Sequence, residues 1–257
     1  MRALLVVGWV AGLLLWECKR ALRPVVDDKW TRDRRNLAVA GLAAAVTQVL
    51  EVPVALAIAG RGAERRQGLL RILPLPPWAK PVAAILLLDY SLYGWHWLTH
   101  RVPFLWNFHR VHHLDREMDA STAVRFHFGE IALSVGYRAA QIRVIGVEPR
   151  EYAAWQGFLM LCILFHHANI RLPLVWERRL AAVLVTPRLH GIHHSVVREE
   201  VNSNWSSGLT VWDRLHGTFR ADWRAELPED SPVLGVEGMR GDEDQTLRWA
   251  LLLPFSR

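Results

Sequence analysis

The chain has 257 residues, of which 51% are hydrophobic and 22% are charged, so a disordered or collagen-like chain is excluded. Its two cysteines, Cys18 and Cys162, lie in apolar runs and are too few for a disulfide framework or a thiolate zinc site. The net charge is +6. Because the aromatic residues lie among apolar runs, this charge favours an anionic membrane surface as the partner and gives only weak support to nucleic acid.

The N-terminal part of the chain has the pattern of membrane helices. Residues 3–16 are apolar and fit a signal peptide or a first membrane helix; no small-residue cleavage site follows, so we expect a helix. Seven Lys and Arg residues between positions 19 and 35 indicate the cytoplasmic side. Residues 37–59 are long enough to span the ~30 Å hydrocarbon core. Glu51 and Pro53 interrupt them, which predicts a kink or an inward-facing polar group.

Three further apolar segments follow. Residues 82–100 predict one helix whose second half carries the first histidines. Residues 131–146 and 151–165 flank a turn, and the first of them contains Arg138 and Arg143. Because arginine is costly in lipid, these two segments predict a shallow hairpin or interfacial helices.

All twelve histidines lie between His96 and His216, a restriction that chance does not explain. They include an H-x-x-x-H motif ending at His100 and two H-x-x-H-H motifs, at 109–113 and 190–194. Helical residues spaced by three or four share a face, so each motif can direct two or three imidazoles to a metal, at about 2.0–2.2 Å. Eight histidines exceed the four ligands of one tetrahedral zinc, which indicates two metals.

Packing and pH sensing account less well for so many histidines. Eight imidazoles buried only for packing would leave many polar rings without a purpose, and a pH sensor would gather cations that repel one another. The chain lacks H-E-x-x-H, G-x-S-x-G, Walker A and G-x-G-x-x-G motifs, so zincin protease, hydrolase, NTPase and dinucleotide-binding functions have no support. Imidazole binds Zn, Cu, Fe and Ni alike, and ligand type therefore does not select the metal.

The order of these motifs resembles the fatty acid hydroxylase superfamily, also called the sterol desaturase family, over roughly residues 10–222. The matching blocks are DYSLYGWHWLTHR, LWNFHRVHHLDREMDASTAVRFHFGE, FHHANIRLP, TPRLHGIHHS and WDRLHGTF. The resemblance implies an integral membrane enzyme with helical membrane hairpins and a cytosol-facing histidine cap. It also implies two metals, taken as iron, that use O2 on lipid-like substrates.

Carried over motif by motif, the resemblance implies ten metal ligands and leaves out His166 and His216. The ten are His96, His100, His109, His112, His113, His127, His167, His190, His193 and His194. The second ring nitrogen of a ligand histidine needs a partner that fixes its orientation. Candidates close to the ligands in sequence are Asp89, Asp115, Glu130, Asn169, Asn204 and Asp213. Trp205 replaces a more usual tyrosine.

The implied function is an O2-dependent di-iron hydroxylase or desaturase of a lipid or sterol-like substrate, with zinc as a substitute metal. Electrons would come from a ferredoxin- or cytochrome-like partner, because the chain has no flavin, haem or iron–sulfur motif. Ether-lipid or carotenoid oxidation on the same site stays open, as does a non-catalytic membrane metal-binding or transport protein. Transport is disfavoured because the histidines follow the spans and lie with Arg and Asp in polar stretches.

These observations predict an all-α fold of about four membrane spans or hairpins, with a cytosol-facing helical cap that carries the dimetal site. We expect one domain over residues 1–257, in the bacterial cytoplasmic membrane because the composition is rich in Arg and Ala and no retention signal is present. Its expected parts are N-terminal membrane helices and a basic loop (1–80), a catalytic region with the histidine motifs (81–225) and a tail (226–257).

Overall fold

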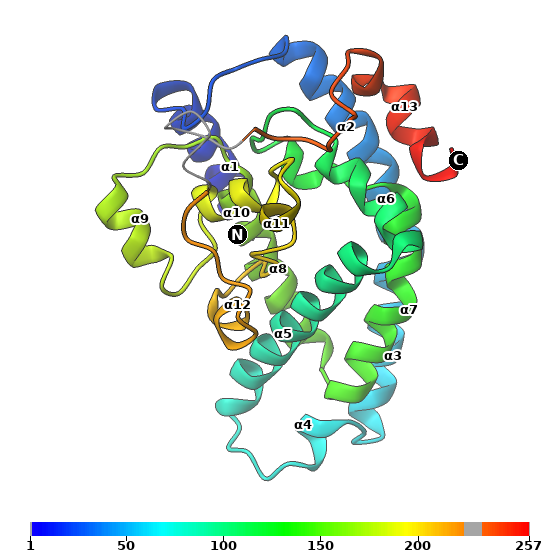
Figure 1. The fold of residues 1–257 in the computed structure, drawn as a ribbon. Coiled ribbons are helices and arrows are strands. Elements are labelled where there is room, and N and C mark those ends of the chain that lie inside the picture. The colour runs from blue at the N-terminus through cyan, green and yellow to red at the C-terminus, as the bar shows by residue number, and fades with distance from the viewer. Residues whose placement is uncertain (1, 224–232, 257) are drawn as a thin grey trace.

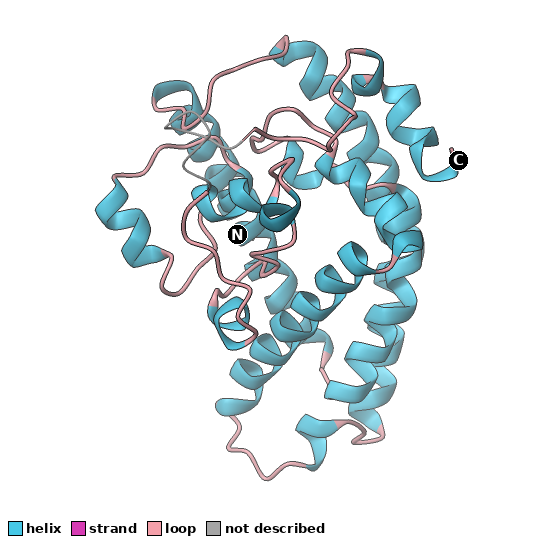
Figure 2. Ribbon diagram, in the orientation of Figure 1, coloured by secondary structure: helices cyan, strands magenta, loops and turns pink. Residues whose placement is uncertain are grey.

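The fold is all-helical in the part of the chain that the computed structural model describes, residues 2–223 and 233–256, with side chains from residue 7 onward (Figure 2). Residues 226–232 of the expected tail lie outside the described residues. The all-α prediction is confirmed. The α-helices are α1 (Arg2–Lys19), α2 (Lys29–Val46), α3 (Val52–Glu64), α4 (Leu69–Ile72), α5 (Ala79–Arg101), α6 (Pro103–His113), α7 (Phe128–Ile145), α8 (Pro149–His167), α9 (Leu174–Leu180), α10 (Pro187–His193), α11 (Arg198–Val201), α12 (Val211–Leu215) and α13 (Leu247–Leu252). Short turns of other helix types are Thr47–Glu51 (π) and Thr122–Val124, Glu243–Gln245 and Leu253–Phe255 (3-10).

Four long helices form the body of the molecule. Helices α3 and α7 run side by side, and α5 packs against both α7 and α8 (Figure 1). Ala55 and Ala59 on α3 are small enough to let the neighbouring helices approach, and they pack in one core with Leu88, Ile142 and Trp155. The short helices α10, α11 and α12 lie with their loops at one side of this body, next to the end of α8.

The second apolar segment is interrupted where the sequence predicts. A π-helical turn, Thr47–Glu51, joins α2 to α3, and Pro53 lies in the first turn of α3, where its missing N–H is tolerated. Glu51 is only 6% exposed and faces the helix bundle. The expected inward-facing polar group is therefore present.

One helical stretch among the described residues, Lys29–Ile72, is long and apolar enough to span a membrane. The segments expected as a shallow hairpin form α7 and α8, helices of 18 and 19 residues. Gly146 joins them in the left-handed conformation (φ 80°), which glycine adopts without strain. Helix α7 packs against α2, α3 and α5, and α8 packs against α5 and α10. Both helices extend beyond the predicted segments at their histidine-bearing ends.

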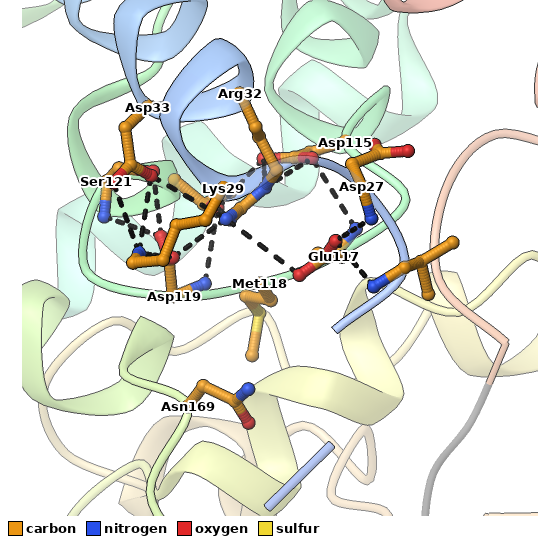
Figure 3. Close-up of polar contacts among 12 residues, drawn as sticks. Asp27, Lys29, Arg32, Asp33, Asp115, Glu117, Met118, Asp119, Ser121 and Asn169 are labelled. Carbon is orange, nitrogen blue, oxygen red and sulfur yellow. Dashed lines mark hydrogen bonds and ion pairs between the residues drawn. The ribbon is translucent and has the colours of Figure 1, made fainter. Parts of the chain in front are cut away.

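A buried ion-pair network fixes the loop after α6 to the start of α2 (Figure 3). Arg32 is 1% exposed; its Nε donates to Asp115 at 3.0 Å and its Nη1 to Asp119 at 2.7 Å. The arginine lowers the pKa of both carboxyls against the opposing effect of burial. Since Asp115 follows the second histidine motif by two residues, the network fixes where α6 ends relative to α2.

Replacing Arg32 by alanine is expected to destabilise the protein by about 3–5 kcal/mol, because the buried carboxylates of Asp115 and Asp119 lose the arginine that they share. Arg34→Ala, on the exposed face of the same helix, is the matched control and should change stability by less than about 1 kcal/mol. Urea unfolding in detergent followed by circular dichroism measures both. Equal midpoints for the two variants would contradict a stabilising role for the network.

Candidate metal centre

Nine histidines of the described residues meet in two groups, and in each group one ring nitrogen per residue lies within 4.8 Å of all the others. The groups draw on α5, α6, α10 and the last residue of α8, so segments about 100 residues apart in sequence contribute to one place. The first group is His96, His100, His109, His113 and His193. The second group is His112, His167, His190 and His194.

Each H-x-x-H-H motif divides its histidines between the two groups. In α6, His109 and His113, four residues apart, belong to the first group, whereas His112 belongs to the second. In and after α10 the division is reversed: His190 and His194 belong to the second group and His193 to the first. Each motif therefore contributes an i, i+4 pair to one group and one ring to the other, and the groups adjoin where the rings of His113 and His194 stack at 4.2 Å.

The first group brings together nitrogen lone pairs that need a cation between them. His96 donates its Nδ1 proton to the carbonyl of Trp205 at 2.7 Å, and His109 directs Nδ1 to the Glu130 carboxylate at 2.8 Å. A neutral imidazole has one N–H, so both Nε2 atoms hold lone pairs, yet they lie 3.1 Å apart. Two nitrogens bound to one metal at about 2.1 Å and an angle of 90–110° are separated by roughly 3.0–3.4 Å.

The second group also brings ring nitrogens within about 3 Å of one another. Nε2 of His167 lies 3.1 Å from that of His112 and 3.0 Å from that of His190, while its Nδ1 donates to the Ile163 carbonyl. Across both groups several buried ring nitrogens have no hydrogen-bond partner among the described residues, and a metal bound to a ring relieves this cost at one nitrogen of that ring. They are Nε2 of His100 and His193, both nitrogens of His113, and Nδ1 of His112 and His190. The donor set fits two metal ions.

Glu130 is the one predicted orienting side chain that contacts a grouped histidine directly, through the bond to His109. It lies in the first turn of α7, which begins at Phe128, directly after the capping residue His127. A carboxylate on the outer nitrogen fixes the tautomer and ring direction and makes the imidazole a stronger ligand.

Asp213 and Asn204 orient two of the grouped histidines indirectly, through a backbone loop. His193 donates to the Ser203 carbonyl at 2.8 Å, and the neighbouring Trp205 carbonyl accepts from His96. The Asp213 carboxylate accepts the backbone N–H of Trp205 at 2.9 Å, and Asn204, at φ 51°, donates to the Leu189 carbonyl in α10. The two side chains hold the loop whose carbonyls orient the rings.

The other three predicted orienting residues have partners elsewhere. Asp89 accepts from the Trp212 indole and the Leu209 backbone, Asp115 pairs with Arg32, and Asn169 binds the backbone at Arg23. Within the described part of the chain, these three side chains form their hydrogen bonds with residues other than the grouped histidines. Proximity in sequence is a poor guide here because a side chain bonds to groups that are near it in space, and these can be far from it in sequence.

His127, His166 and His216 lie in neither group. His127 accepts from the Gly129 N–H through Nδ1, and its Nε2 lies 3.2 Å from the Leu251 carbonyl, so both nitrogens have protein partners. This position differs from the metal ligand that the resemblance implies and makes His127 the cap of α7. His166 packs on His190 with ring centres 4.0 Å apart, and exposed His216 stacks on Tyr93.

Burial favours the neutral form of His112, His190 and His193. It lowers the pKa of His193 to about 3 and those of His112 and His190 well below the ordinary value, with neighbouring histidines adding to the effect. The unfolded chain, with histidine pKa values near 6.5, therefore binds protons that the folded chain excludes. The stability of metal-free protein should be fully present above pH 6.5 and fall as pH drops below it. Thermal unfolding in detergent at pH 7.5 and 5.5 measures this, and an unchanged midpoint would contradict the assignment of neutral buried rings.

A cavity of about 240 Å³ opens beside the histidines, between α5, α7, α8 and the π-helical turn. His96, His109, His112, His167 and His190 form part of its wall. The remaining wall is largely apolar and also contains a few polar side chains, among them Glu51, Arg138 and Gln156. The histidine groups are thus adjacent to a partly open cavity of the kind that binds small or lipid ligands.

These features define a helical protein with two adjoining histidine groups, each suited to one metal ion, beside a largely apolar cavity. The family model described as fatty acid hydroxylase matches residues 81–218, more than half of the chain, and the chain belongs to this family. The sequence resemblance is thereby confirmed, and residues 81–218 contain all twelve histidines.

Relatives of known function are similar over part of their length. The chain is 30% identical over 177 residues to ornithine lipid hydroxylase OlsE of Rhizobium tropici, covering 68% of this chain and 50% of OlsE. It is 29% identical over 149 residues to human alkylglycerol monooxygenase, covering 57% of this chain and 32% of that enzyme. It is 27% identical over 154 residues to mouse cholesterol 25-hydroxylase, covering 59% of this chain and 49% of that enzyme. The chain therefore spans about half the length of these relatives, or less. No solved structure matches it.

Proposed function

We propose that this chain is a membrane di-iron oxygenase that hydroxylates or desaturates a lipid or sterol-like substrate with O2. The observation that carries the proposal is the convergence of nine histidines in two groups beside an apolar cavity. All-nitrogen ligation with two adjacent metals suits O2 chemistry and does not match the carboxylate-rich pattern of helix-bundle dimetal proteins. The names of the relatives, two hydroxylases and a monooxygenase of lipids or sterols, support the same class.

The two groups would hold one iron ion each, with zinc as a substitute metal. Bound iron supplies the activation of O2 toward an unactivated C–H bond. The protein holds the ligands neutral through burial and fixes four of the rings, those of His96, His109, His167 and His193, through hydrogen bonds to the outer nitrogen. The apolar cavity wall orients the substrate and excludes water. Electrons would come from a separate ferredoxin- or cytochrome-like protein.

We further propose that α2–α3, α5, α7 and α8 lie in the membrane, with the histidine cap facing the bacterial cytoplasm. Exposed apolar side chains on three of these helices support the placement: Leu86 and Trp97 on α5, Val144 on α7, and Met160 and Leu161 on α8. Two of the cations at positions 19–35 contact the segments that carry the histidine motifs, since Arg23 donates to the Pro187 carbonyl and Arg32 pairs with Asp115, in agreement with a cytoplasmic location. The bacterial relative OlsE agrees with a bacterial membrane. Residues 81–225 would form the catalytic region of one domain.

Lipid analysis of cells tests the proposed function. Cells that express the wild-type chain should accumulate lipids heavier by one oxygen atom, or lighter by two hydrogens, in an O2-dependent manner. Cells that express His193→Ala at equal protein level should not. Identical lipid profiles in the two strains, with iron bound to the wild-type protein, would contradict the proposal.

A further inference from the structure

We propose that Glu51 and Arg138 form a polar anchor that binds an uncharged hydroxyl group at one end of the substrate, remote from the carbon that is oxidised. The inference rests on the proposed function and narrows the substrate to amphipathic lipids of the alcohol or sterol kind. It starts from two charged residues that the metal centre does not use.

Both charges are buried within the helix bundle. Glu51 is 6% exposed and Arg138 is 9% exposed, and Nε of the arginine lies 3.4 Å from Oε1 of the glutamate. Ionisable residues among membrane helices are costly and commonly mark a functional site. A buried pair is also a weak source of stability compared with apolar residues of the same volume. Packing alone therefore gives little reason for the pair.

The pair has hydrogen-bonding capacity to spare. Nη1 of Arg138 donates to Gln141 at 2.6 Å and Nε faces the Glu51 carboxylate, whereas no hydrogen bond from Nη2 is found among the described residues. Oε1 of Glu51 accepts from the Tyr152 hydroxyl at 3.0 Å, and no hydrogen bond to Oε2 is found among the described residues. Both side chains line the cavity. A ligand in the cavity can therefore reach a donor and an acceptor at one place.

The anchor is well separated from the metal centre. Arg138 lies eight residues beyond Glu130 on α7, about 12 Å along the helix at ~1.5 Å per residue. On α8, Gln156, which lines the cavity with the pair, precedes His167 by eleven residues, about 16–17 Å. The wall also contains apolar side chains of α5, α7 and α8: Leu92, Trp95, Ile131, Leu159, Met160 and Ile163. A ligand that fills the cavity thus meets polar groups at one end and histidines at the other.

The charge of the pair selects the ligand group. Glu51 and Arg138 neutralise each other, so a charged headgroup would enter as an uncompensated buried charge. A hydroxyl can donate to the carboxylate and accept from the guanidinium at the same time. An uncharged hydroxyl is therefore favoured over a carboxylate, phosphate or ammonium group.

Binding of labelled 1-hexadecanol, its methyl ether and hexadecane to the purified full-length protein in detergent tests the anchor. Wild type should bind the alcohol about tenfold more tightly than either other ligand, the effect of roughly one net hydrogen bond or more. Glu51→Leu combined with Arg138→Met removes both charges together and should abolish the preference while hexadecane binding and metal content stay unchanged. Arg143→Met, exposed on the same helix, is the matched control and should retain the preference.

Two results would overturn the anchor: a preference for the alcohol that survives in the double variant, or equal binding of the alcohol and its methyl ether by wild type. The second needs no variant and so does not depend on how the double variant folds. Preferential binding of the alcohol by iron-loaded wild type, without O2-dependent oxidation of any lipid, would contradict the proposed function and leave the anchor standing.

Discussion

Alanine at His112 or His193 is expected to abolish oxidation and to lower the metal content from about two ions per chain to about one. Each substitution removes one ligand, His112 from the second group and His193 from the first, and leaves the buried ligands around it without their metal. The measurement is elemental analysis of the purified variants together with lipid oxidation in cells.

The control is His216→Ala, which removes an exposed imidazole that belongs to neither group. This variant should keep both metals and its activity. Circular dichroism should give the same helix content for all three variants. Full activity in His112→Ala or His193→Ala would remove that residue from the ligand set.

Loss of the Glu130 carboxylate is expected to lower metal affinity or activity by about 10–100-fold, the usual effect of removing the outer partner of a ligand histidine. Glu130→Ala leaves Nδ1 of His109 without its acceptor, whereas Glu130→Gln offers an amide oxygen and should retain more of the function. Titration of metal against a competing chelator measures the affinity separately from turnover.

Glu64→Ala, which changes an exposed glutamate on α3, is the matched control and should have wild-type affinity. A Glu130→Ala protein with the metal affinity and activity of wild type would show that the bond to His109 has no orienting role. Recovery in Glu130→Gln relative to Glu130→Ala separates hydrogen bonding from a loss of folding.

Local patterns in the sequence predict the helices and the histidines that cluster together well. The segment 82–100 corresponds to α5, Ala79–Arg101, and the interruption at Glu51 corresponds to a π-helical turn. Histidine spacing identifies eight of the nine residues of the two groups, because a spacing of three or four is a property of one helix, and His167 enters through the family resemblance.

Long-range contacts are where sequence reasoning fails. Helical spacing does not show that His112 and His193 belong to a different group from the other two histidines of their own motifs. That division depends on how α6 and α10 face each other. The carbonyls of Trp205 and Ser203 orient two rings, and backbone atoms leave no mark in residue type. Asp115 is taken by Arg32, 83 residues away, which nearness to the histidines cannot reveal.

The number of metal ions and the atoms that bind them test the central claim most directly. X-ray absorption at the metal edge, combined with elemental analysis of protein loaded anaerobically with iron(II), gives both quantities. The account predicts two ions per chain with imidazole nitrogens as the dominant ligands at about 2.0–2.2 Å. Folded protein that binds less than one ion per chain in excess iron(II), or whose bound metal lacks imidazole ligands, would contradict it.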